Sequence, residues 1–129
     1  MPGGFLKRAL FRMAHKPDSV LTSQKIIDTN HSLNPQSCVN SRSTLDLMCD
    51  LVSDEKDCYL RAAYCVYYIG YYKPFTCCNE DTAFYLASDA LKSEHGLPDN
   101  EAFRHKFDIW CNGDSPVEEI AEWLRTCKT

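Results

Sequence analysis

Cysteine is the residue type with the most chemical potential in this sequence. Thiols at high density either form disulfides or bind metal ions. Zinc-type sites use close pairs such as C-x2-C or cysteine clustered with histidine, and neither pattern occurs here. The even number and wide spacing therefore predict four disulfides in an oxidising compartment. The eight cysteines among the 129 residues are Cys38, Cys49, Cys58, Cys65, Cys77, Cys78, Cys111 and Cys127.

The spacing restricts the pairing of these cysteines without determining it. Cys58 and Cys65 are two helical turns apart, about 10 Å by helix rise, so they cannot bond each other. The adjacent Cys77 and Cys78 are expected to reach two different partners. Eight cysteines allow about a hundred pairings, and the sequence does not choose among them.

Catalytic groups are scarce. Two of the four histidines, His15 and His31, lie in an irregular N-terminal segment. Of the others, His95 precedes a glycine at an expected helix end, and His105 lies on the polar side of an expected helix. The sequence contains no nucleophile elbow, phosphate-binding loop or H-E-x-x-H motif. We therefore expect no enzyme activity, no metal site and no cofactor.

Residues 77–85, CCNEDTAFY, are similar to the CC-x-x-HD-x-C-Y helix of secreted phospholipases A2. In that family the histidine is the general base and the aspartate binds calcium. Here Asp81 and Thr82 occupy those two positions, Phe84 replaces the second cysteine, and no Gly-rich calcium loop precedes them. The resemblance covers nine residues and implies no phospholipase activity.

The stretch DCYLRAAYCVYYIGYY, residues 57–72, is predicted to be the central helix. At 100° per residue, one stripe carries Cys58, Ala62, Cys65, Ile69 and Tyr72, and the opposite side carries Leu60, Tyr64, Tyr67, Tyr68 and Tyr71. Only Asp57 and Arg61 are charged, so we expect this helix to be buried on nearly all sides.

An aromatic surface is the candidate binding site. The simplest interpretation places the aromatic rings in the core. However, the chain has seven tyrosines and six phenylalanines, more than a few helix–helix contacts can bury. Tyrosine clusters are favoured at interfaces, so the rings could instead line an apolar cavity or form an exposed contact patch. The candidate residues are Tyr64, Tyr67, Tyr68, Tyr71, Phe75, Phe103, Phe107 and Trp110.

Apolar residues at helical spacing predict further helices on both sides of the central one. Capping signals and apolar stripes place one helix before it, near 44–52, and three after it. The first of these three is capped by Asn79 and stops near His95-Gly96, and the other two lie near 100–110 and 116–127. No strand-like alternation occurs. We expect an all-α, disulfide-stapled bundle of about four to five helices in residues 36–129. Residues 1–35 are expected to form a basic, loosely structured arm, in which a short helix around Ile26 and Ile27 could dock onto the body.

The net charge of −4 argues against a nucleic-acid partner, and no apolar run reaches membrane-spanning length. The basic start of the chain, FLKRALFRMA, is interrupted by charges and is not a secretory signal peptide. Because the cysteines indicate an oxidising compartment, we expect a secreted protein whose signal peptide has been removed.

These observations predict a secreted, non-enzymatic protein that binds a protein receptor or target, as a toxin, effector or signalling ligand does. The alternative is a carrier of a small hydrophobic ligand. In size, acidity, helicity and cysteine content the chain is similar to insect odorant-binding proteins, although their cysteine spacing is absent. An enclosed apolar cavity beside the tyrosines would favour the carrier, and a filled core with aromatic rings facing water would favour the protein binder.

Overall fold

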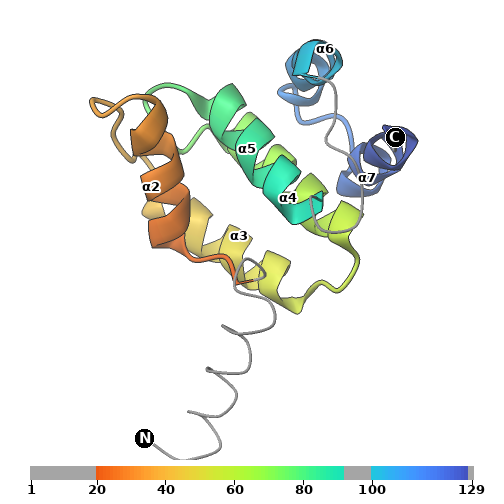
Figure 1. The fold of residues 1–129 in the computed structure, drawn as a ribbon, viewed down its shortest axis with the longest axis horizontal. Helices are drawn as coiled ribbons and strands as arrows, with labels where there is room; N and C mark the ends of the chain where they lie inside the picture. The colour runs from red at the N-terminus through yellow and green to blue at the C-terminus, as the bar shows by residue number, and fades with distance from the viewer. Residues whose placement is uncertain (1–19, 92–99, 128–129) are drawn as a thin grey trace, which may run out of the picture.

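The computed structural model describes residues 20–91 and 100–127, and within these ranges the protein consists of helices without strands (Figure 1). One isolated antiparallel bridge joins Val39 to Phe75. The all-α prediction is confirmed, with six compactly packed helices in the described part of the chain. They are α2 (Ser23–Leu33), α3 (Arg42–Asp54), α4 (Cys58–Tyr72), α5 (Asn79–Leu91), α6 (Asn100–Trp110) and α7 (Val117–Thr126).

Helix α4 occupies the centre, as the sequence predicted, and contacts α3, α5, α6 and α7. Figure 1 shows α4 and α5 side by side, with α2 and α3 on one side and α6 and α7 on the other. Alanines at the contact surfaces, among them Ala62 and Ala63 of α4 and Ala83 and Ala87 of α5, are fully buried. Their small side chains allow the two helices to approach closely, which packs the centre of the bundle.

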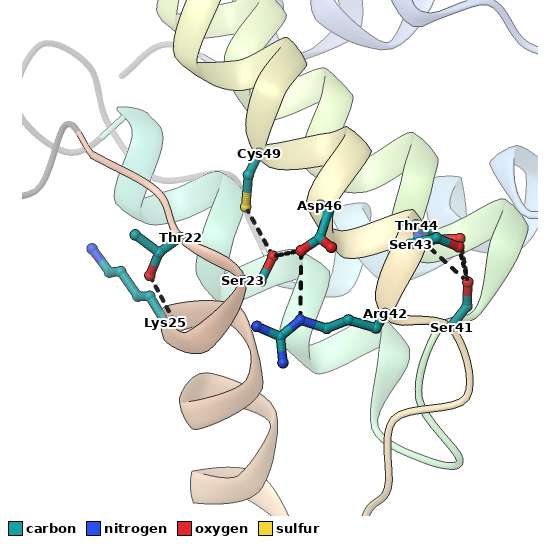
Figure 2. A network of polar contacts seen from close by, with 9 residues as sticks. All are labelled: Thr22, Ser23, Lys25, Ser41, Arg42, Ser43, Thr44, Asp46 and Cys49. Carbon is teal, nitrogen blue, oxygen red and sulfur yellow. Dashed lines mark hydrogen bonds and ion pairs between the residues drawn. The ribbon is translucent and has the colours of Figure 1, made fainter.

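A helix forms where the sequence suggested a short docking helix around Ile26 and Ile27, within the segment expected as an arm. Helix α2 packs against α3 and α5, with Ile26 and Asn30 fully buried, so the folded body begins before residue 36. The Ser23 hydroxyl donates to Asp46 Oδ1 at 2.6 Å and lies 3.7 Å from Cys49 Sγ, which ties the start of α2 to α3 (Figure 2). Residues 1–19 of the arm predicted for residues 1–35 lie outside the described residues.

The beginning and end of α4 are set by local chemistry. Asp57 caps the helix, and its Oδ1 accepts a hydrogen bond from the Tyr59 backbone N–H at 2.9 Å. The other carboxylate oxygen of Asp57 lies 2.5 Å from Arg125 Nη2, which joins the start of α4 to the end of α7. At the far end Lys73 adopts a left-handed conformation with φ of 47°, and Pro74 prevents the helix from continuing.

Candidate functional site

The two sides of α4 have opposite environments. Ala62, Ala63, Val66 and Ile69 point inward and are fully buried. The opposite side carries five tyrosines, which we call the tyrosine face: Tyr64, Tyr67, Tyr68, Tyr71 and Tyr72. The prediction that α4 is buried on nearly all sides does not hold for the end of the helix, where Tyr71 and Tyr72 are exposed.

The rings of the tyrosine face form a continuous cluster. Tyr67 stacks on Tyr71 with centroids 5.8 Å apart, and Tyr68 stacks on Tyr72 at 5.5 Å. Edge contacts at 5.3 Å between Tyr67 and Tyr68 and at 4.9 Å between Tyr71 and Tyr72 join these two stacks. Tyr64 extends the cluster toward the start of the helix, 6.4 Å from Tyr68. Because each ring is held by its neighbours, the surface is largely ordered before any partner arrives.

Exposure increases toward the end of α4. Tyr64, Tyr67 and Tyr68 are half-buried, whereas Tyr71 is 45% and Tyr72 is 50% exposed. A tyrosine can occupy such a position because its ring packs on a neighbour while its hydroxyl stays in water. The face is therefore a half-exposed aromatic surface with hydroxyl groups available for hydrogen bonding.

The turn between α6 and α7 supports Tyr71 from the side. Gly113 in this turn has φ of +78°, a conformation that favours glycine. A Cβ atom at this position would lie 2.3 Å from Cε1 of the Tyr71 ring, so the glycine lets the ring lie directly against the backbone. An Asn-Gly pair in the sequence indicates a turn but not this contact with Tyr71.

The charge on the tyrosine face differs from that of the whole protein. Within α4 the only charged residue is Arg61, which lies on the same side of the helix as the tyrosines, and Lys73 follows the last of them. Burial, reinforced by the neighbouring rings of Tyr72, Tyr67 and Tyr64, raises the pKa of Tyr68 above its usual value. The face is thus uncharged at its centre and basic at its edges, on a protein whose net charge is −4.

The other four aromatic candidates do not join this surface. Phe75, Phe103, Phe107 and Trp110 are at most 3% exposed and belong to the core. Phe103 contacts Phe107 and Trp110 with centroids 5.7 and 6.0 Å apart, so these rings pack against one another inside the bundle. Tyr72, which helical periodicity placed on the cysteine stripe, belongs instead to the exposed cluster. Its spacing of four residues from Tyr68 was the signal that could have identified it.

The cysteines lie at several depths in the structure. Cys49 and Cys65 are buried, Cys38 is exposed, and the other five are half-buried. Burial raises the pKa of the Cys65 thiol to about 12, and burial also raises the pKa of Cys49, Cys78 and Cys111. No two sulfur atoms lie at bonding distance, so the predicted disulfides stay a prediction.

Other chemistry is sparse in the part of the chain that the structure describes. No group of three or more histidine, cysteine or acidic side chains is arranged to hold a metal ion there. His31 and His105 are both exposed, and His15 and His95 lie outside the described residues. None of the described helices is long and apolar enough to cross a membrane.

A surface hollow of about 430 Å³ lies between α2 and α5. Its lining combines apolar and polar side chains, including Leu33, Leu86 and the ion pair of Lys25 Nζ with Asp89 Oδ2 at 3.3 Å. Tyr85, which is 52% exposed, forms part of the rim, and no residue of the tyrosine face takes part.

Comparison of the chain with models of known protein families, with characterised proteins and with solved structures found no match. The geometry of the chain's own residues is therefore the basis for any functional inference.

Proposed function

We propose that this protein is a secreted, non-enzymatic binding protein that contacts a partner protein through the tyrosine face. The observation that supports this proposal is the continuous cluster of five rings on α4, in which Tyr64, Tyr67 and Tyr68 pack partly against the core and Tyr71 and Tyr72 are about half exposed. Solvent-exposed rings cost free energy that burial against a partner would recover, at roughly 25 cal/mol per Å² of apolar area. Tyrosine is also among the residues that contribute most to binding energy at protein interfaces.

The rings of the tyrosine face are already ordered in the folded protein, which also favours binding. Binding normally costs conformational entropy because interface side chains must become fixed. The rings of Tyr67, Tyr68, Tyr71 and Tyr72 already stack on one another, so much of this cost is met during folding. A tyrosine also has few rotatable bonds for its contact area, which lowers the remaining cost.

The chemistry of the face indicates what the partner offers. A matching surface would present apolar groups to the rings and hydrogen-bond acceptors to the hydroxyls. Lys73, which follows the last tyrosine of the face, favours a carboxylate on the partner. The net charge of −4 disfavours a nucleic acid, because phosphate binding requires a basic surface. A toxin, effector or signalling ligand that binds a protein receptor would fit this description.

Secretion and stabilisation by disulfides belong to the same proposal. The support is the eight cysteines together with the absence of a metal-binding cluster among the described residues. Oxidised cysteines would hold the short helices together outside the cell and keep the tyrosine face in a fixed shape. Reduced thiols with a stoichiometric metal ion in the purified protein would contradict this part of the proposal.

A second candidate function rests on the hollow between α2 and α5. Its volume of about 430 Å³ would hold a small ligand, and the Lys25–Asp89 ion pair at its wall would suit a ligand with one polar end. The carrier prediction called for an enclosed apolar cavity beside the tyrosines, and this hollow differs in its place and in its lining. We rank the carrier second for that reason.

The matched pair Tyr72→Ala and Tyr85→Ala separates the two functions. The two side chains are 50% and 52% exposed, but only Tyr72 belongs to the tyrosine face and only Tyr85 lines the hollow. Partners would be captured from extracellular fluid of the source organism, and their affinity for each variant measured by surface plasmon resonance. We expect Tyr72→Ala to weaken binding about 30-fold, the size typical of a central interface tyrosine, and Tyr85→Ala to leave it unchanged.

Two other results would overturn the protein-binding proposal. One is a captured partner whose affinity responds equally to both substitutions. The other is a small molecule that co-purifies with the wild type and is lost in Tyr85→Ala, as detected by native mass spectrometry. The second result would favour the carrier.

A further inference from the structure

We propose that the eight cysteines form the disulfides Cys49–Cys65, Cys58–Cys127, Cys38–Cys77 and Cys78–Cys111. This assignment rests on the oxidised state included in the proposed function, and it selects one of about a hundred possible pairings. A disulfide requires Cα atoms about 4.4–6.8 Å apart, so the packing of the helices restricts which pairs can form.

Cys49 and Cys65 are the two buried cysteines, at 9% and 2% exposure. They belong to α3 and α4, two packed helices joined by a connection of only residues 55–57, which makes the helices antiparallel neighbours. Burial is the main cause of the raised pKa of Cys65, and the charge of a Cys49 thiolate adds to it. Figure 2 shows the Cys49 side chain pointing away from α3 toward Ser23 of α2, within the interior of the bundle.

Cys58 and Cys127 meet where the start of α4 reaches the end of α7. The residues on either side of Cys58 both contact Arg125. Asp57 Oδ2 is 2.5 Å from the guanidinium group, and the ring of Tyr59 lies beneath it, with 5.2 Å from Cζ to the ring centroid. Cys127 follows Arg125 by two residues. These contacts bring this part of the two helices together and place the two cysteines beside the same ion pair.

Cys38 and Cys77 lie beside the isolated bridge. The Val39–Phe75 pairing is antiparallel, so Cys38 is opposite Thr76, and two hydrogen bonds of 2.9 Å join these residues. Directly opposed residues in such a pair have Cα atoms about 5.5 Å apart. Cys77 is the next residue along the chain. Its Sγ accepts a hydrogen bond from Asn34 Nδ2 at 3.3 Å, and the Cys38 thiol donates to the backbone carbonyl of Gln36 at 3.6 Å, so both sulfurs lie against the same loop, residues 34–38.

Cys78 and Cys111 remain, and their surroundings agree with the pairing. Cys111 Sγ lies 3.7 Å from a Cβ position at Gly70, near the end of α4, where the chain turns toward α5. Glu80, two residues after Cys78, pairs with Arg104 of α6 at 3.1 Å and contributes to the raised pKa of Cys111. Cys77, by contrast, points to α2, where its Sγ accepts a hydrogen bond from Asn34 Nδ2 at 3.3 Å.

Each bond would form by thiol–disulfide exchange with an oxidised disulfide donor of the secretory pathway. One cysteine thiolate attacks a sulfur of the donor and forms a mixed disulfide, and the second cysteine then displaces the donor. Two thiol protons and two electrons leave the chain for each bond, and the donor is released as a dithiol. The four bonds would connect α3, α4, α5, α6 and α7 while leaving the tyrosine face unmodified.

Peptide mapping of the wild-type protein from a eukaryotic secretory host tests the assignment. The protein is first alkylated without reduction to detect free thiols, then digested without reduction. Trypsin cleaves after Lys56 and Arg61 and after Arg125 and Lys128, which isolates Cys58 in DCYLR and Cys127 in TCK. We expect these two peptides joined in one species. Chymotrypsin, which cleaves after the tyrosines of α4, would then separate Cys65 from Cys77 and Cys78.

Two double variants distinguish the adjacent Cys77 and Cys78. Under the proposed pairing, the Cys38→Ser/Cys77→Ser variant loses one complete bond and contains no thiol that can be alkylated. The Cys38→Ser/Cys78→Ser variant breaks two bonds and leaves Cys77 and Cys111 open to alkylation. The opposite pattern would overturn the assignment of these two bonds.

The outcomes also separate this inference from the proposal on which it rests. Eight alkylated thiols in the wild type would contradict the oxidised state itself. Four bonds with another connectivity, such as DCYLR joined to a peptide other than TCK, would overturn the pairing while leaving secretion and disulfide stabilisation intact. Neither result depends on the tyrosine face, which is tested by its own substitutions.

Discussion

The inner and outer sides of α4 both carry apolar or aromatic residues. Their burial differs because the side chains differ in size. The inner side carries Ala62, Ala63, Val66 and Ile69, which are fully buried and allow neighbouring helices to approach. The outer side carries five tyrosines, whose rings pack on one another and of which Tyr71 and Tyr72 are exposed. The comparison shows that close helix packing selects small residues, whereas large aromatic rings on the same helix stay partly in contact with solvent.

The largest contrast is expected between Ile69→Ala and Tyr72→Ala. Ile69 is fully buried, so its truncation leaves a cavity and should lower the free energy of unfolding by about 2–5 kcal/mol. Tyr72 is half exposed, so its truncation should cost about 1 kcal/mol or less while weakening partner binding. Urea denaturation followed by circular dichroism would measure both. Equal losses of stability would mean that the tyrosine face is part of the core.

The substitution Gly113→Ala should disturb the support of Tyr71. The added methyl group meets the Tyr71 ring and also requires an unfavourable backbone conformation at φ of +78°, so we expect a loss of about 1–2 kcal/mol in unfolding free energy. The exposed neighbour provides the control, because Asn112→Ala adds nothing to this contact. If both variants unfold at the same urea concentration, Gly113 does not have the supporting role described here.

The contact between α4 and α7 should show a smaller effect. Asp57→Ala removes both the cap of α4 and one partner of Arg125, and we expect a cost of about 1 kcal/mol. Glu122→Ala removes only the exposed second partner of Arg125 and should cost about 0.5 kcal/mol or less. Thermal unfolding monitored by circular dichroism would rank them, and a larger effect of Glu122→Ala would contradict the importance of the cap.

The smallest effect concerns the ionisation of Tyr68. Because its pKa is raised in the folded protein, ionisation opposes folding, so its contribution to stability is present below the usual tyrosine value of about 10 and is lost at higher pH. Titration of the ultraviolet absorbance of tyrosinate should show a late component that disappears in Tyr68→Phe. Tyr85→Phe controls for the loss of one tyrosine. A late component that persists in Tyr68→Phe would show that another residue produces it.

The sequence predicted the helices well because their signals are local. A helix capped by Asn79 and ending near His95-Gly96 was expected; α5 spans Asn79–Leu91, and residues 92–99 lie outside the described residues. The central helix was expected at 57–72 and begins one residue later. Helix α2 was only suggested, because its apolar positions are few and alternate with polar ones, and its burial depends on contacts with α3 and α5. The local sequence pattern of α2 does not show its contacts with α3 and α5, so its burial could not be predicted.

The candidate site was predicted in part. Four of the five residues of the tyrosine face were named from the sequence, but their orientation was not determined, because periodicity counts tyrosine as apolar whether it points inward or outward. Phe103 and Trp110 were grouped with them as aromatic residues, and the structure places both in the core. Which rings become buried depends on the volumes of residues far apart in the chain. The pairing of the cysteines likewise depends on which distant segments lie side by side in the folded protein.

Site-specific photo-crosslinking would test the central claim most directly. A benzophenone side chain would replace either Tyr72 or Tyr85, which have equal exposure on different helices, and each protein would be irradiated in extracellular fluid of the source organism. The proposal predicts a covalent product with one partner protein from position 72 and none from position 85. A product from position 85 alone, or no protein product from either position, would contradict the assignment of the tyrosine face as the binding surface.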